Sequence, residues 1–371
     1  MFPVTQLDGD PINQDWVNAR AKFERAIEIM QVKQNSEVSR LFSPLDEFAD
    51  FETFDIVNNP RLHHRSNWVR EGLKDGLQKA QQFNGVNPYQ LGFVGGTDNH
   101  NGLTSDVEEY DWKGAHGTED TSPAQRATGE VPGWLKTVYT NPGAITGVWA
   151  ESNTRDDIWQ SIHDRETFAT SGTRIQVRFF GSWHYTDNLH DLPNNIETAY
   201  EEGVPMGGEL DAGDSTGNAP RFMVMAISDP DSAYLDRIQV VKGWLDNEGN
   251  TQEKVYDVVW SDPNNRQSDP NYHNRLPPIT NSVNIAAASY TKVVDGKNIS
   301  APELSTTWTD PDYDASQPAF YYARVLEAHT PRWSTYDAHN MGTEPPADVP
   351  ATIQERAWSS PIWIKPVASA Q

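Results

Sequence analysis

The chain of 371 residues contains no cysteine. Disulfide bonds, zinc sites built on thiolates and catalysis by a thiol are therefore excluded, and any metal must be held by oxygen and nitrogen ligands. No apolar run approaches the roughly 18 residues that a membrane-spanning helix needs. The opening residues, MFPVTQLDGDPINQDW, also lack the charged start and apolar centre of a signal peptide.

Positive charge is scarce, with 29 Lys and Arg against 53 Asp and Glu and a formal net charge of −24. A field of this sign repels nucleic acids and anionic membrane surfaces, so neither is expected as a partner. The acidic surface is typical of a soluble protein in a salty or extracellular setting, which favours a periplasmic or extracellular location over the cytoplasm. Nothing in the composition indicates an oligomeric state.

Apolar residues are also few, at 36%, but 13 Trp, 13 Tyr and 13 Phe supply large side chains for a core. Gly and Pro, at 25 each, indicate many turns and long ordered loops rather than a helical bundle. The length predicts two domains.

The first part of the chain has the strand–helix–strand order of an α/β layer. Apolar spacing predicts helices over residues 14–25 and 67–83 and strands over residues 26–32 and 89–94. The segment 101–154 is rich in Gly, Pro, Asp and Thr, which predicts a long irregular loop, and loops of that length are usually functional or disordered.

The second part is predicted to be β-rich. After a helix at residues 154–166, Ile175, Val177 and Phe179 alternate with other side chains, as in a strand. No helix is expected after about residue 195. Strands are predicted for RFMVMAI, RIQVVKGWL, KVYDVVW, AFYYARVLEA and SPIWIK. The pattern favours an antiparallel sandwich and a division into domains at 1–190 and 191–371.

The stretch LGFVGGTDNHNGL places Asp98 and His100 directly after an apolar strand. Residues two apart on an extended chain project to the same side, and ligands gather at the carboxyl ends of strands in α/β layers. A carboxylate and an imidazole together suit zinc, manganese or iron. The alternative is a turn that happens to carry both residue types.

Several segments together resemble the bacterial DUF3604 family, which is related to the PHP (polymerase and histidinol phosphatase) metallohydrolases. The segments are GFVGGTDNHNG, FSPLDEFADFE, WVREGLKDGL, RETFATSGTRI, VPMGGEL and TPRWSTYDA with IQERAWSSPIW. The resemblance covers nearly the whole chain.

This resemblance implies a distorted, PHP-like β/α barrel that binds divalent metal ions at its carboxyl-terminal strand ends. Asp98 and His100 match the last D-x-H ligand pair of such proteins. The chain contains no H-x-H, T-D-H or P-H-N motif for the earlier ligands. The resemblance therefore implies a partial barrel without its N-terminal half, followed by the β-rich region, and little activity in this chain alone.

Four further residues are candidates for contact with substrate or for support of the metal ligands, namely Glu28, Gln31, Lys33 and Asn101. The resemblance places the strand that carries Glu28 beside the last ligand strand, and Gln31 and Lys33 follow at its end. Glu28 has an alternative interpretation as a buried carboxylate paired with Lys33 or Arg70.

Two residues are candidates for catalysis. His116, between glycines in the long loop, suits a general acid or a phosphate ligand, or else is simply exposed to solvent. Arg174 suits an anionic substrate group, or else an ion pair with one of the many acids. Arg332 and Trp333 predict a structural turn in which the guanidinium stacks on the indole.

The favoured function is a metal-dependent hydrolase of a phosphoester or related ester. The alternative is a non-catalytic binding or structural protein whose Trp- and Tyr-rich β region recognises a polymer such as a carbohydrate.

Overall fold

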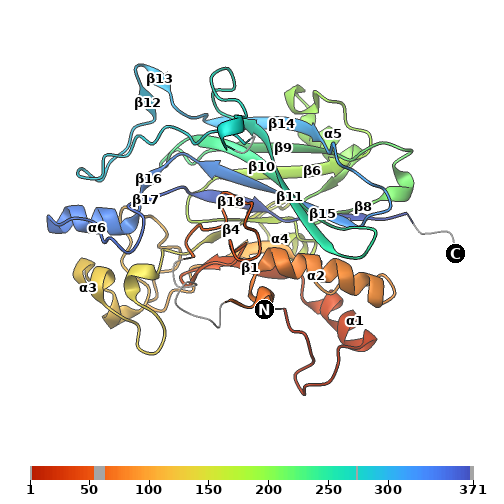
Figure 1. Ribbon diagram of the computed structural model, residues 1–371, viewed down its shortest axis with the longest axis horizontal. Coiled ribbons are helices and arrows are strands. Elements are labelled where there is room, and N and C mark those ends of the chain that lie inside the picture. Colours follow the sequence, from red (N-terminus) through yellow and green to blue (C-terminus); the bar gives the residue numbers. More distant parts are fainter. Residues whose placement is uncertain (1, 54–62, 273–274, 368–371) are drawn as a thin grey trace.

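The computed structural model describes residues 2–53, 63–272 and 275–367. This part of the chain is mixed α/β with mostly antiparallel sheets stacked in layers, as Figure 1 shows. The α-helices are α1 (Gln14–Phe23), α2 (Val69–Gln82), α3 (Pro123–Thr128), α4 (Arg155–His163), α5 (Asn195–Glu202) and α6 (Trp333–Met341).

The largest sheet forms the middle layer. Its main path runs in the order β11 (Thr251–Trp260), β10 (Leu235–Leu245), β15 (Ala319–Glu327), β18 (Arg356–Ser359), β5 (Thr167–Thr170) and β4 (Ile145–Val148). β19 (Ile362–Lys365) also pairs with β15 and continues in parallel to β8 (Glu209–Asp211). All the other pairings in this sheet are antiparallel.

A smaller antiparallel sheet covers one face of the large sheet. Its order is β14 (Glu303–Thr309), β9 (Arg221–Ile227), β6 (Gln176–Ser182) and β7 (Val204–Pro205). Aromatic rings join the two layers, because Phe222 of β9 lies 4.5 Å from Tyr321 of β15 and stacks on Phe179 of β6 at 5.3 Å. Two mostly antiparallel sheets therefore pack face to face as in a sandwich, but they include β4, β5 and β6, which precede the predicted β-rich region.

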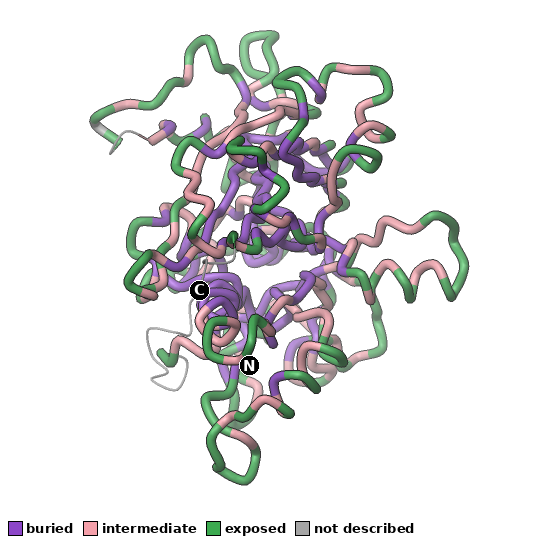
Figure 2. Tube along the Cα trace, turned by 90° about the vertical axis from the view of Figure 1, so that its right-hand side faces the viewer, coloured by how far each residue is buried: buried purple, intermediate pink, exposed green. Residues whose placement is uncertain are grey.

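Strand β15 is buried along its whole length because both of its faces are covered. Tyr321, Ala323 and Val325 pack in the core between the two sheets. The alternate residues Phe320 and Tyr322 pack in a second core, together with α2 and the strands described next. Figure 2 shows the buried part of the chain concentrated where these layers meet, with exposed loops at the periphery.

The third layer is a small sheet in the order β2 (Gln34–Asn35), β1 (Ala26–Gln31) and β3 (Gly92–Gly95), in which β1 and β3 are parallel. Helix α2 lies between β1 and β3 in the sequence and packs on the large sheet through Val69, Leu73 and Leu77. This is the predicted strand–helix–strand unit, and it forms one layer with α1 below the sheets in Figure 1.

The edge of β3 is closed by hydroxyl groups of the large sheet instead of by a further strand. The Phe93 amide donates to Ser360 Oγ at 2.9 Å, and the Phe93 carbonyl accepts from Thr167 Oγ1 at 2.9 Å. Thr146 Oγ1 binds both the amide and the carbonyl of Gly95. These bonds fix the carboxyl end of β3 against β4 and β5.

Two short antiparallel ribbons complete the strands, β12 (Val293–Val294) with β13 (Lys297–Asn298) and β16 (Thr330–Pro331) with β17 (Thr352–Ile353). Among the described residues no sheet closes into a barrel. The partial PHP-like barrel therefore remains a prediction. The division at residue 190 also remains one, although β4 and β5 from the first part share a sheet with β18 from the second.

The expectation of no helix after residue 195 is wrong, since α5 and α6 both lie there. The segment predicted as a turn at Trp333 is the first turn of α6, whose residues Trp333, Ser334 and Thr335 are all buried. The loop 101–154 contains α3 and β4. None of the helices in the described ranges has the length and apolar character needed to cross a membrane.

Candidate functional site

The carboxyl ends of β1 and β3 meet at one edge of the small sheet because the two strands run in parallel. Glu28 of β1 lies opposite Val94 of β3, and the register shifts between Glu28 and Met30. The segment after β1 and the segment after β3 then run side by side, since the Val32 amide donates to the Thr97 carbonyl at 3.1 Å.

Asp98 and His100 lie beyond this edge and face each other. His100 Nε2 is 3.3 Å from Asp98 Oδ1, and both side chains are about half exposed. The two side chains do not meet through the alternation of a strand, as expected from the sequence. Strand β3 ends at Gly95, and Asp98 has a positive φ of 50°. The left-handed turn at Asp98 brings the imidazole back over the carboxylate.

Gln31 and Lys33 reach the same place from the end of β1. Gln31 Nε2 donates to Asp98 Oδ2 at 2.5 Å, and Gln31 Oε1 accepts from the Lys33 amide at 2.7 Å. The Lys33 ammonium donates to Ser36 Oγ at 2.5 Å. One oxygen of Asp98 is thus held by Gln31, while the other faces His100.

Glu28 adds a second carboxylate behind Asp98. Burial raises its pKa, repulsion from Asp98 adds to the rise, and Lys33 opposes it. Removal of water from the Lys33 ammonium lowers the pKa of Lys33, while Glu28 and Asp98 act in the other direction. A Cβ at position 96 would lie 2.5 Å from Glu28 Oε1, so any other residue there would require the Glu28 carboxylate to move.

His116 joins the group from the long loop. Its ring centroid lies 5.3 Å from that of His100 and 5.1 Å from that of Trp134. Its Nδ1 is 3.0 Å from Asp120 Oδ2, and its Nε2 is buried without a hydrogen-bond partner among the described residues. His116 is largely buried, at 7% side-chain exposure, and so is not the solvent-exposed residue of the alternative interpretation.

Asp120 is a fully buried carboxylate that orients His116. It accepts hydrogen bonds from the amides of Ala115 and His116, each at 2.8 Å. Burial alone would raise the pKa of Asp120, but the hydrogen bonds from the His116 ring and these two amides lower it overall. An ionised Asp120 assigns the proton of neutral His116 to Nδ1, which leaves Nε2 as the basic nitrogen.

The distance between Asp98 Oδ1 and His100 Nε2 suits a shared divalent ion. Two metal–ligand bonds of about 2.1 Å at an angle of about 100° span about 3.2 Å, and the observed separation is 3.3 Å. A structural or catalytic site needs at least three protein ligands. Across residues 2–53, 63–272 and 275–367, no group of three or more His, Asp or Glu side chains is arranged to hold a metal. The pair fits two positions of a coordination sphere, and no more.

Two predicted residues have other contacts. Asn101 donates from Nδ2 to the Gly114 carbonyl at 2.7 Å and accepts from the Leu103 amide at 3.0 Å, so its side chain fixes the loop. Arg174 pairs with Glu108 at 3.0 Å and lines a separate cavity of about 310 Å³. The ion-pair interpretation of Arg174 matches this geometry.

Sequence reasoning missed Asp120 as a partner of His116. The spacing HGTED, in which a carboxylate follows the histidine by four residues, was the available signal. It carried little weight alone, because the segment's fold into a 3₁₀ turn was not evident from periodicity.

The family model described as protein of unknown function (DUF3604) matches residues 1–366. No curated protein and no solved structure matches the chain. Since the match spans nearly all of the sequence, the chain belongs to the DUF3604 family.

Proposed function

We propose that this chain carries part of the active site of a PHP-type, metal-dependent hydrolase that acts on a phosphoester or related ester. The observation that carries the proposal is the pair of Asp98 Oδ1 and His100 Nε2, 3.3 Å apart at the carboxyl end of parallel strands. Zinc, manganese and iron are the ions that this donor set suits. The relation of the family to PHP proteins is part of the proposal.

A bound divalent ion supplies Lewis-acid polarisation of an ester oxygen and lowers the pKa of water. The chain's own residues prepare the pair for this role. Gln31 holds Oδ2 of Asp98, so that Oδ1 is directed to the same side as the imidazole of His100. The Lys33 ammonium lies near both Glu28 and Asp98 and offers a positive charge to an anionic substrate.

His116 and Asp120 supply a means of moving a proton. Asp120 fixes the orientation of the ring through Nδ1. Nε2 is then the atom that takes up or gives a proton, and its lack of a hydrogen-bond partner among the described residues leaves it available. His116 is largely enclosed, and its ring contacts those of His100 and the exposed Trp134.

The test is binding of Mn²⁺ and Zn²⁺ to the purified chain by isothermal titration calorimetry, with turnover of chromogenic phosphate esters measured in parallel. We expect Asp98→Asn and His100→Gln each to weaken metal binding at least tenfold. His163→Gln is the matched control, since His163 Nδ1 is also 3.3 Å from a carboxylate oxygen, that of Asp164, on the exposed helix α4. Equal affinity in all variants, or no binding by the unaltered chain, refutes the proposal.

The alternative of a non-catalytic, carbohydrate-binding protein makes the opposite forecast for Asp98→Asn, namely unchanged function. Several of the Trp and Tyr residues that suggested this alternative are buried, including Tyr321, Tyr322 and Trp358. These residues contribute to packing of the core.

A further inference from the structure

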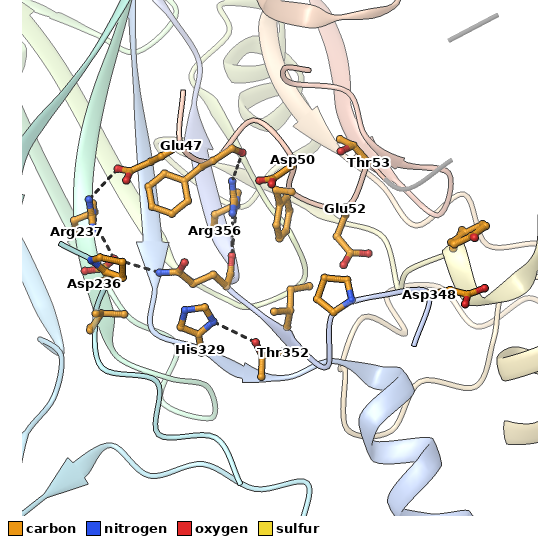
Figure 3. Close-up of a pocket in the computed structure, with 18 residues that line it drawn as sticks. Glu47, Asp50, Glu52, Thr53, Asp236, Arg237, His329, Asp348, Thr352 and Arg356 are labelled. Carbon is orange, nitrogen blue, oxygen red and sulfur yellow. Dashed lines mark hydrogen bonds and ion pairs between the residues drawn. The ribbon is translucent and has the colours of Figure 1, made fainter. Parts of the chain in front are cut away.

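A cavity of about 760 Å³ lies between the segment Glu47–Thr53, the start of β10 and the residues around β17. Figure 3 shows its lining, with Asp236 and Arg237 at one end, Asp348 at the other, and His329 and Arg356 between them. This volume lies within the range of small-molecule sites, about 300–1,000 Å³. Neither Asp98 nor His100 lines it.

Each of the five carboxylates that line this cavity has a basic partner. Glu47 pairs with Arg237 at 3.1 Å, Asp50 with Arg40 at 2.7 Å, Glu52 with Arg332 at 2.9 Å, Asp236 with Arg266 at 2.7 Å and Asp348 with Lys136 at 3.8 Å. Asp236 also pairs with Arg237 at 3.0 Å. The negative charges that line the cavity are therefore largely balanced by neighbouring basic side chains.

Among the charged residues that line the cavity, Arg356 differs in having no ion-pair partner within the described part of the chain. It is 2% exposed, and no carboxylate among the described residues lies within ion-pair distance of its guanidinium. Its N–H groups donate only to the backbone carbonyls of Phe48 and Gln354, all at 3.4 Å, which is longer than the usual range of about 2.7–3.2 Å. Arg356 thus leaves one buried positive charge without an ionic partner.

The surroundings make this charge costly. One face of the guanidinium lies over the ring of Phe51 at 3.6 Å. Burial, with repulsion from Arg324 as the next cause, lowers the pKa of Arg356 to about 9. Three carboxylates act on this pKa in the other direction, namely Glu37, Asp46 and Glu355. A buried cation without a partner destabilises a fold, and a hydrogen-bonded counter-ion removes that penalty.

Neutral donors lie on the same wall. His329 and Thr352 line the cavity, and His329 Nδ1 is 3.4 Å from Thr352 Oγ1. Burial lowers the pKa of His329, so the ring is neutral near pH 7 and offers one N–H. Arg356, Thr352 and His329 all line the cavity, and a guanidinium, a hydroxyl and an imidazole are groups that donate hydrogen bonds to oxyanions.

We propose that this cavity binds a small organic oxyanion, in which a phosphate or carboxylate group pairs with Arg356. The oxyanion supplies the direct ion-pair partner that no described carboxylate gives Arg356. The cavity is larger than one phosphate ion requires, so the anionic group is attached to an organic body that contacts Phe48, Phe51 and Ile279. This site does not depend on the proposed hydrolase function.

The test is calorimetric titration of the full chain with inorganic phosphate, phenyl phosphate and benzoate, with sodium chloride as the control for ionic strength. We expect saturable binding of one anion per chain, tighter for phenyl phosphate than for inorganic phosphate. Equal affinity of these two would show that phosphate alone is the ligand and would overturn the organic part of the proposal. No anion binding beyond the chloride control would overturn all of it.

Arg356→Met and Arg356→Lys locate the site. We expect the Met variant to lose anion binding at least tenfold while melting at the same or a higher temperature, because it removes an unpaired buried charge. The Lys variant should retain part of the affinity. Arg155→Gln, on the exposed start of α4, is the matched control. Unchanged anion affinity in a folded Arg356 variant would refute the assignment, whatever the metal affinity of Asp98 and His100.

Discussion

Two regions of buried charge differ in how they are neutralised. In the first, Glu37 and Asp46 meet Arg70 and Arg324 in a cluster where every ion has a partner. In the second, around the start of β18, the adjacent residues Glu355 and Arg356 line different cavities and neither has an ion pair among the described residues. The first region stabilises the fold, and the second leaves a carboxyl group and a guanidinium at cavity walls without ion-pair partners in the ranges that the structure describes.

The paired cluster joins distant parts of the chain. Arg324 of β15 binds Asp46 at 2.7 Å, and Arg70 of α2 binds Glu37 at 2.7 Å. Tyr322 and Trp358 also donate to Glu37, at 2.6 and 2.7 Å. Burial acts to raise the pKa of Glu37, but the two arginines outweigh it and the pKa falls. These contacts attach the segment after β2 to the large sheet.

The unpaired region contains acids that hold their protons. Burial raises the pKa of Glu355 to about 8, and neighbouring carboxylates, including Glu327, add to the rise. Burial likewise raises the pKa of Glu327 to about 8. One oxygen of Glu327 is buried without a hydrogen-bond partner among the described residues. The comparison therefore separates ionised, paired carboxylates from neutral, unpaired ones.

The largest expected effect breaks the paired cluster. Glu37→Gln leaves two buried arginines short of a counter-charge, and we expect a loss of about 3–5 kcal/mol in the free energy of unfolding. Urea denaturation measures it. Glu303→Gln on the exposed start of β14 makes the same chemical change and should cost less than about 0.5 kcal/mol. A loss below about 1 kcal/mol for Glu37→Gln would show that the cluster is not structural.

The next effect concerns pH. A carboxyl whose pKa rises from about 4.3 in the unfolded chain to about 8 in the fold binds more protons when folded, so the stability it provides is lost as pH rises between these values. The unaltered protein should therefore lose stability from pH 5 to pH 8 through Glu327 and Glu355.

Glu327→Gln should remove part of this dependence. We expect the variant to melt near the temperature of the unaltered protein at pH 5 and several degrees above it at pH 9, because the amide need not be deprotonated. Melting temperature measured across this pH range tests the point. Glu355→Gln should behave in the same direction. A steeper fall in stability for either variant would mean that these acids are ionised and paired.

The smallest effect concerns an exposed pair. Arg174 and Glu108 are 3.0 Å apart, with 58% and 27% of their side chains exposed. Arg174→Gln should cost less than about 1 kcal/mol, and added salt should reduce the cost further. Urea denaturation at low and high salt measures both. A fully retained stability together with lost ester turnover would instead support the catalytic role that the sequence suggested for Arg174.

Periodicity predicted the elements that bury one face. The stripes of α1 and α2 and the apolar runs of β1, β9, β10 and β15 all appear near their expected positions. Helix α6 was not predicted from the sequence because its polar residues Ser334, Thr335 and Asp337 are buried beside Trp333. The helix therefore has no apolar stripe. A helix enclosed by protein on several sides does not show the pattern of a surface helix.

The parts of the candidate site that depend on residues close together in the sequence were predictable. Asp98 and His100 are two residues apart, and parallel strand ends predict their approach to Gln31. The isolation of Arg356 was not predictable, because a chain with 53 acidic residues suggests that every arginine has a partner. Whether a particular charge lacks one depends on tertiary packing that brings together segments about 300 residues apart in the chain.

Strand β15 has a consequence for how the molecule opens. One face of β15 packs in the core between the two sheets, and the other packs against the layer that carries Asp98. Separation of either layer would therefore expose large aromatic rings of β15 to water. The amide protons of β15 should therefore exchange with deuterium only through complete unfolding. The site at the end of β3, which packs on the same layer, should be held as rigidly as this core.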